Sequence, residues 1–515
     1  MCLEGEKNFM ANFLNAMKNL ANEKLTENGA FALKSTKSSL IDLFGMIGAM
    51  RTRSDRDVID AFIKAYAEDR LLAMKMLFYA RDVREGLGER KIVKTIFAHL
   101  ARNHKDDIEI NFDIISEYGR WDDFYAFVGT PLEAKAFAKM KSQFDSDLQN
   151  LKEGKNVSLL AKWLKSQNTS SNESKRLGRL TAKYFYPEIE DFNSRAAHYR
   201  KDLAALRAKI EIVESKMSAK KWDEIEYESV PSKASTIYRE AFRTHDSERY
   251  NEFIGNVNNG TAKINAKVLY PYELIRPYTK NCGWSRPYIS MDETLEAQWK
   301  ALPNYVTEDK DFLIMADVSG SMSGLPMDVS ISLAIYFAER NKGAYHNTIM
   351  TFESQPKFIE IPEINDKTKE ALTLAEKVAY VNDMGWGGST NLKAAFEMVL
   401  NAAVKGNVKP EDMPKALVVI TDMEIDAYGR NDVTFTTAMK ERFEAAGYEM
   451  PTIVWWNVNA RMDTFHGEYN DTGVRFISGC SSTIFKSLCE NMGTTPEELM
   501  LMTLNSERYD AVKIA

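Results

Sequence analysis

The chain has 515 residues, too many for one ordinary hydrophobic core, so the sequence predicts two or more domains. Its apolar fraction of 44% and charged fraction of 27% are typical of a soluble globular protein, and no apolar run is long enough to cross a membrane. The N-terminus lacks the basic and apolar segments of a secretion signal, and the four cysteines are sparse and unclustered. We therefore expect a cytoplasmic protein with reduced thiols and no membrane partner.

The net charge of −7 is unevenly distributed along the chain. Residues 1–300 carry 48 Lys and Arg against 43 Asp and Glu, whereas residues 301–515 carry 19 against 31. Within the first part, residues 151–210 hold 13 basic and 6 acidic residues. This asymmetry indicates two modules with different partners, although a solvated charged surface without a partner would have the same composition.

Residues 1–300 show a helical pattern almost throughout. Apolar side chains recur at intervals of three and four in the first of these segments, Val58–Tyr66, Leu72–Val83 and Ile92–Leu100. We expect shorter helices at Ser158–Ser166 and Arg176–Phe185, and one long helix at about Ser194–Met217. Consecutive helices joined by short turns favour an array of HEAT-like helical repeats, although no fixed repeat period is visible.

The pattern changes after a polar stretch, residues 301–310, which we interpret as a linker. From residue 311 to residue 515, predicted strands and helices alternate. The strands are expected at Phe312–Ala316, His346–Phe352, Lys357–Ile361, Ala416–Thr421, Thr452–Asn457 and Val474–Ser478. Helices are expected at Met327–Asn341, Lys367–Tyr380, Asn391–Lys405, Thr434–Ala446, Ser482–Glu490 and Thr495–Leu504. Continuous apolar strands are typical of a parallel sheet covered on both faces, so this part predicts a doubly wound α/β domain.

Hard oxygen ligands follow two of these strands. Asp317, Ser319 and Ser321 come directly after the strand at residues 312–316, and Asp422 comes directly after the strand at residues 416–421. Because ligands bind beyond the carboxyl ends of parallel strands, these side chains are expected at one sheet edge. Thr390, in a Gly-Gly-Ser-Thr-Asn segment, would complete a site for Mg²⁺ or Mn²⁺.

A simpler interpretation is that Ser319 and Ser321 only cap the following helix. The order of strand, Asp-x-Ser-x-Ser, Gly-Gly-Ser-Thr-Asn and strand-Thr-Asp nevertheless resembles the von Willebrand factor A fold with its metal-ion-dependent adhesion site. The resemblance covers about residues 308–515. It implies that the cation is held, directly or through water, by Asp317, Ser319, Ser321, Thr390 and Asp422. Since only two carboxylates would serve the cation, it could also take an acidic group of a protein partner.

Three N-terminal segments combine polar and aromatic residues in an unusual way: Leu77–Arg90, Tyr118–Asp123 and Trp222–Ala234. With the metal motif, they resemble the Ro type, a TROVE-like helical module followed by a von Willebrand A domain, and most of all an uncharacterised Ro-like family of viruses, bacteria and plants. Residues 1–54 lie outside the resemblance. It implies a helical array that closes into a ring and binds small structured or misfolded RNA, as a non-catalytic component of a ribonucleoprotein.

The sequence also offers its own candidates for RNA contacts. Basic residues are dense from Lys155 to Lys201, with aromatic residues interleaved, and such surfaces neutralise phosphates and stack unpaired bases. The candidate RNA-binding residues are Lys162, Lys165, Lys175, Arg176, Arg179, Lys183, Arg200, Lys201 and Lys233. The interleaved aromatic residues are Trp163, Tyr184, Phe185 and Tyr199. The alternative is that the aromatic residues belong to the core and the basic ones to a solvated face.

Motifs for catalysis are missing from the sequence. It contains no phosphate-binding loop, no histidine cluster of zinc hydrolases and no nucleophile elbow, so we do not expect an enzyme. Two carboxylates are also fewer than two-metal nucleases usually need. Two alternatives to RNA binding stay open: a metal-dependent scaffold for protein interactions, and a partner subunit of a separate ATPase.

Overall fold

The computed structural model describes residues 17, 20–210, 212–279, 291–306, 312–351, 354–382, 389–484 and 494–515. The chain divides into two compact units, each assembled from separate segments. Unit 1 comprises Met1–Asp69, Tyr270–Asp292 and Pro303–Ser506, and unit 2 comprises Arg70–Leu269, Glu293–Leu302 and Glu507–Ala515. These compact units do not follow the division at residue 300 that the sequence indicates, and that division into functional domains stays a prediction.

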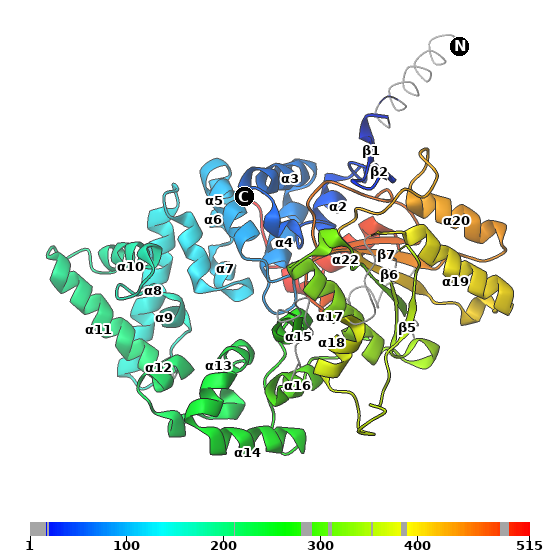
Figure 1. The fold of residues 1–515 in the computed structure, drawn as a ribbon. Coiled ribbons are helices and arrows are strands. Elements are labelled where there is room, and N and C mark those ends of the chain that lie inside the picture. The colour runs from blue at the N-terminus through cyan, green and yellow to red at the C-terminus, as the bar shows by residue number, and fades with distance from the viewer. Residues whose placement is uncertain are drawn as a thin grey trace, which may run out of the picture. The chain divides into compact units, whose positions relative to one another are not determined.

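Unit 1 is built on a six-stranded sheet in the order β5-β4-β3-β6-β7-β8 (Figure 1). Its strands are β3 (Phe312–Ala316), β4 (Thr348–Thr351), β5 (Phe358–Glu360), β6 (Ala416–Thr421), β7 (Thr452–Asn457) and β8 (Val474–Ser478). All neighbouring strands are parallel except the edge strand β5, which is antiparallel to β4. Every side chain of β3 and β6 is buried, which explains their uninterrupted apolar sequences. The predicted α/β sheet is thus confirmed.

Helices accompany the strands of this sheet. They are α15 (Pro271–Thr279), α17 (Leu325–Arg340), α18 (Leu374–Asn382), α19 (Leu392–Gly406), α20 (Phe435–Ala445) and α22 (Pro496–Leu504). Helix α17 packs against β3 and β4, and α15 packs against α17 and α18. Gly324, with a φ of +89°, and a proline in the first turn mark the start of α17, which fixes the loop between Asp317 and this helix.

An N-terminal segment belongs to the same unit, and of its elements the sequence predicts only the helix around Val58–Tyr66. It contains a hairpin of β1 (Glu23–Leu25) and β2 (Phe31–Leu33), followed by α2 (Ser39–Phe44) and α3 (Asp55–Glu68). Helix α2 packs against β8 and α22, and the Leu33 N–H donates a hydrogen bond to the Phe465 carbonyl over 2.9 Å. Part of residues 1–54, which the family resemblance leaves out, therefore completes the α/β unit.

Unit 2 is helical throughout, apart from turns, as the sequence predicts (Figure 1). Its helices are α4 (Arg70–Arg81), α5 (Lys91–Asn103), α6 (Lys105–Glu109), α7 (Phe112–Tyr118), α8 (Glu133–Lys152), α9 (Leu160–Trp163), α10 (Asn172–Phe185), α11 (Phe192–Ile210), α12 (Val213–Ser218), α13 (Ser232–His245), α14 (Ser247–Asn258) and α16 (Glu293–Lys300). Helix α10 packs against α8 and α11, and α11 also packs against α9. The predicted single helix at Ser194–Met217 is wrong, because Ile212 is extended and a second helix begins at Val213.

Some predictions lie partly outside the described residues. These are the helix at Ser482–Glu490, the linker beyond residue 306, Gly387 and Gly388, and three of the four cysteines. Within the described part of the chain, no helix has both the length and the apolar character that crossing a membrane would require.

Candidate functional site

Asp317 and Asp422 leave two adjacent strands at the same edge of the sheet. Strands β3 and β6 pair in parallel register up to Ala316 and Ile420, and the Asp317 N–H donates to the Ile420 carbonyl over 2.9 Å. The chain runs outward from β3 to β4 on one side and from β6 to β7 on the other, so this is the switch point of the sheet. Both carboxylates therefore lie just beyond the ends of their strands, as the sequence predicts.

Hydrogen bonds fix the Asp317 carboxylate. Its Oδ1 accepts from the Ser319 N–H over 2.9 Å, and its Oδ2 accepts from the Thr421 hydroxyl over 2.7 Å. The hydroxyl oxygens of Ser319 and Ser321 lie 3.1 Å apart. Burial, reinforced by the negative charge of Asp422, raises the pKa of Asp317 from 3.8 to about 6. A cation between these acids would therefore relieve an unfavourable charge.

The Asp422 carboxylate already has one cationic neighbour. Its Oδ2 accepts from Nη2 of Arg461 over 2.9 Å, and its Oδ1 accepts from the Glu424 N–H over 3.2 Å. The residue after it, Met423, has a φ of +73°, a strained value for this side chain. The Met423 carbonyl accepts a hydrogen bond from Nε2 of His466 over 2.9 Å, which holds the backbone beyond Asp422 in place.

Thr390 is tied to the loop that follows Asp422. Its hydroxyl donates to Oδ1 of Asp426 over 2.8 Å, and its N–H donates to Oδ2 of the same carboxylate over 2.9 Å. The Thr390 hydroxyl also accepts from the Asn28 side chain over 3.0 Å, and that amide donates to the Glu424 carbonyl over 2.7 Å. Because its hydroxyl already has these partners, Thr390 would coordinate a cation through a water molecule more readily than directly.

The donor set fits a hard divalent cation. It consists of two buried carboxylates and the two serine hydroxyls, and next to Thr390 the buried Ser389 hydroxyl has no hydrogen-bond partner among the described residues. No three acidic, histidine or cysteine side chains of the described residues gather in a way that could hold a metal ion. A cation at this sheet edge would therefore depend on hydroxyl and water oxygens as well.

Sequence reasoning missed two neighbours of this candidate metal centre, Arg461 and the β1–β2 turn. Arg461 pairs with Asp422 and with Glu27, each over 2.9 Å, and the Glu27 N–H donates to Glu424 over 2.6 Å. Arg461 follows the carboxyl end of β7, so its strand-end position was a usable signal. The hairpin turn had no signal, because nothing in the sequence around Asn28 indicates contact with residues 390–424.

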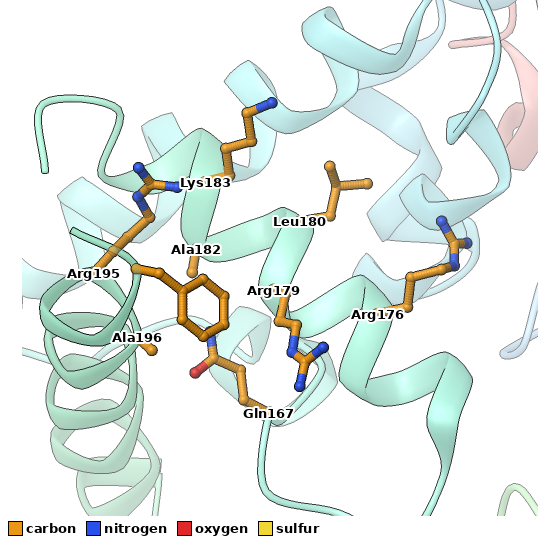
Figure 2. A pocket seen from close by; sticks show the side chains of 9 residues that line it. Gln167, Arg176, Arg179, Leu180, Ala182, Lys183, Arg195 and Ala196 are labelled. Atoms are coloured by element: carbon orange, nitrogen blue, oxygen red, sulfur yellow. The ribbon is translucent and has the colours of Figure 1, made fainter. Parts of the chain in front are cut away.

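A second candidate site lies in unit 2, where α10, α11 and the loop before α10 line an open pocket of about 300 Å³. Its lining residues are Gln167, Arg176, Arg179, Leu180, Ala182, Lys183, Phe192, Arg195 and Ala196. Figure 2 shows Gln167 and Arg179 on one side of this basic pocket and Lys183 and Arg195 on the other, with the small side chains of Ala182 and Ala196 between them. Three of the predicted RNA-binding residues, Arg176, Arg179 and Lys183, thus lie together.

The charges around the basic pocket are only partly neutralised. Arg176 pairs with Glu173 over 2.7 Å, and Arg195 donates to the carbonyls of residues 189 and 190. Within the described ranges, neither Arg179 nor Lys183 has a carboxylate within ion-pair distance, and both side chains are exposed. The pocket therefore presents two cations, Arg179 and Lys183, that have no counter-ion among the described residues.

Other predicted RNA-binding residues are placed differently. Lys165 lies 3.8 Å from the buried carboxylate of Asp122, and burial lowers the pKa of this lysine. Lys162 lines a separate pocket of about 350 Å³, and Lys233 lies on α13. Arg200 borders the basic pocket by donating to Gln167 over 3.4 Å. Lys175 and Lys201 lie on α10 and α11 without lining the pocket.

The interleaved aromatic residues mostly serve packing. Phe185 and Tyr199 are buried, and Tyr184 stacks on Phe137 with ring centroids 4.3 Å apart. Phe192, which was not singled out from the sequence, is instead 54% exposed and lines the basic pocket. No sequence signal indicated this exposure, because the spacing of Phe192 from Ala196 and Tyr199 fits a buried helix face.

Comparison with known proteins places the chain in a family. The family model described as "Domain of unknown function (DUF2828)" matches residues 26–130 and 121–310. A second family model, "Domain of unknown function (DUF7788)", matches residues 311–513. The chain belongs to the DUF2828 family and carries a DUF7788 domain. It is also 30% identical over 526 residues to "Uncharacterized protein L728" of Acanthamoeba polyphaga mimivirus. The aligned region covers 94% of this chain and 88% of that relative.

Proposed function

We propose that the chain is a non-catalytic, cytoplasmic RNA-binding protein of the Ro type, a component of a ribonucleoprotein that binds small structured or misfolded RNA through unit 2. The observation that carries the proposal is the basic pocket, where Arg179 and Lys183 lack a carboxylate partner among the described residues. Lysine and arginine bind RNA by neutralising phosphates and releasing their counter-ions. Cations that are already paired within the protein contribute less to that exchange.

We propose in addition that unit 1 is a von Willebrand A domain holding Mg²⁺ or Mn²⁺. The strand order with one antiparallel edge strand supports this assignment, and so does the acid pair Asp317 and Asp422 at the switch point. Ser319 and Ser321 would complete the direct ligands, with Thr390 acting through water. When bound, the cation would supply an electrophilic position for an acidic group of a protein partner, while Arg461 keeps Asp422 oriented.

Charge reversal in the basic pocket tests RNA binding. We expect the combined substitutions Arg176→Glu, Arg179→Glu and Lys183→Glu to abolish binding of a small structured RNA in a filter-binding titration. Replacing the same three residues by Gln instead removes three cations. Because about 0.7 counter-ions are released per neutralised phosphate on single strands, this change should lower the slope of log affinity against log salt by about 2. Lys267→Glu, an exposed change outside the pocket, serves as the matched control.

The wild-type protein must first bind RNA in a salt-dependent way. Binding that is absent, or that does not change with salt, would exclude the proposed function. A metal-dependent scaffold is the second candidate, favoured by the acid pair, which stands independently of the basic pocket. In that case a protein partner should be lost on chelation or on Asp317→Ala, with no nucleic acid in the complex.

A further inference from the structure

The wall of the basic pocket that carries Gln167 is fixed by two residues of α11. Arg207 of α11 donates to the Leu164 carbonyl over 2.7 Å and to the Ser166 hydroxyl over 2.8 Å. The Tyr199 hydroxyl donates to the Lys165 carbonyl over 2.8 Å. The four-residue wall, residues 164–167, is therefore held by α11 before any ligand arrives.

The wall also approaches α10 closely at Gly178. A Cβ added to this glycine would lie 2.8 Å from the Lys165 carbonyl oxygen and 3.0 Å from the carbonyl carbon of Ser166, both backbone atoms that cannot turn aside. Gly178 thus permits the wall to reach α10, and the Gln167 amide donates to the Gly178 carbonyl at 3.4 Å. The distance between this wall and α10 is therefore set by a close backbone contact at Gly178.

The chemistry of the lining combines three kinds of group. Phe192 exposes 54% of its surface, and the Arg179 guanidinium lies 5.7 Å from its ring centroid. Among the residues that the structure describes, the Gln167 amide makes two hydrogen bonds, both long at 3.4 Å, so much of its donor and acceptor capacity is available to a ligand. Arg179 and Lys183 supply the positive charge. An aromatic face, an amide and two cations match the base, the base edge and the phosphate of a nucleotide.

We propose that the basic pocket binds one unpaired nucleotide of the bound RNA. The base stacks on Phe192, the amide of Gln167 contacts its edge, and Arg179 and Lys183 hold the adjoining phosphate. A volume of about 300 Å³ lies at the small end of ligand pockets, which span about 300–1,000 Å³, and gives room for a single nucleotide. Bases of a duplex are stacked and paired, so they cannot enter. This inference rests on the proposed function, and it names the RNA feature that is recognised.

Fluorescence anisotropy with the full chain tests the inference. The probes are a short unstructured RNA strand and the blunt-ended duplex that it forms with its complement. The wild type should bind the strand more tightly than the duplex. Because base–aromatic stacking contributes about 1–3 kcal/mol, Phe192→Ala should weaken strand binding by about 5-fold or more and leave duplex binding unchanged. Phe192→Tyr, which keeps the ring, should retain the wild-type affinity.

Ile237→Ala is the matched control, since it truncates another exposed apolar residue of a unit 2 helix, with 66% of its surface exposed. If the wild type binds the strand and Phe192→Ala binds it equally well, the pocket is not a nucleotide site, while RNA binding by other cations still stands. If the wild type binds neither probe, the inference is wrong. The proposed function is also wrong if the small structured RNA of the filter-binding titration is not bound either. Circular dichroism and thermal melting of each variant exclude loss of the fold as the cause.

Discussion

At the scale of single residues, Asp317 has the clearest physical signature. A buried carboxylate beside a second carboxylate is unfavourable, and its pKa rises from 3.8 to about 6 as a result. At a pH between 3.8 and about 6, Asp317 of the folded protein holds a proton that the unfolded chain releases. The group therefore favours folding at low pH, and its ionisation costs the folded state about 3 kcal/mol above pH 6.

We expect Asp317→Asn to stabilise the metal-free protein at pH 8 by up to about 3 kcal/mol, because it removes the buried charge. The difference from wild type should vanish near pH 4, where the wild-type carboxyl is protonated. Urea unfolding with a chelator at both pH values measures this. Mg²⁺ should raise the stability of the wild type but not of the variant.

Asp366→Asn provides the control for this prediction, since Asp366 is fully exposed in unit 1. An Asp317→Asn protein that is less stable than wild type at pH 8 without metal would contradict the account. So would an equal response of both proteins to Mg²⁺.

The sequence located Asp317 and Asp422 correctly because residues that end adjacent parallel strands must meet at one edge. It could not reveal that the Thr390 hydroxyl is engaged by Asp426 and Asn28, since those contacts depend on how two loops and a hairpin pack. Phe192 was missed for a similar reason. Its spacing is compatible with a buried helix face, and only the packed structure leaves it exposed.

At the scale of elements, strands were predicted better than helices. The bounds of β3, β6, β7 and β8 agree with the predicted ones, because burial of both faces makes these strands mostly apolar. Strand β8 is nevertheless interrupted by a buried arginine, Arg475. Helix α18 begins at Leu374 instead of Lys367, since Lys369 has a φ of +61° in a turn closed by hydrogen bonds to Asn365. Strands β1 and β2 have only three residues each, too few for a periodic pattern.

Helix α10 carries a prediction of its own at Gly178. In an exposed helix, replacing glycine by alanine stabilises by up to about 1 kcal/mol. At Gly178 the added methyl would meet the Lys165 carbonyl, so Gly178→Ala should instead destabilise the protein and weaken binding of single-stranded RNA by moving the Gln167 wall. Thermal unfolding and anisotropy on the same preparation measure the two effects.

Gly255→Ala in α14 is the matched control, because its added Cβ has no atom within 4 Å. This variant should be as stable as the wild type or more so, with unchanged RNA affinity. If Gly178→Ala behaves like Gly255→Ala, the close approach of the wall to α10 is not what shapes the basic pocket.

At the scale of the whole molecule, the two candidate sites fall into different compact units. The acid pair of Asp317 and Asp422 belongs to unit 1, and the basic pocket belongs to unit 2. This separation agrees with the sequence, in which residues 301–515 carry the excess of acidic side chains and residues 151–210 the excess of basic ones. Because negative charge repels RNA, the proposed RNA contacts belong to unit 2 alone and the proposed cation to unit 1.

Ultraviolet crosslinking of a bound RNA to the full chain, followed by mass spectrometry of the crosslinked peptides, tests the central claim most directly. The account predicts crosslinks within Asn172–Phe185 and at Phe192, with their yield falling in Phe192→Ala. Crosslinks confined to residues 312–484, or spread over the chain without enrichment at α10 and α11, would contradict it.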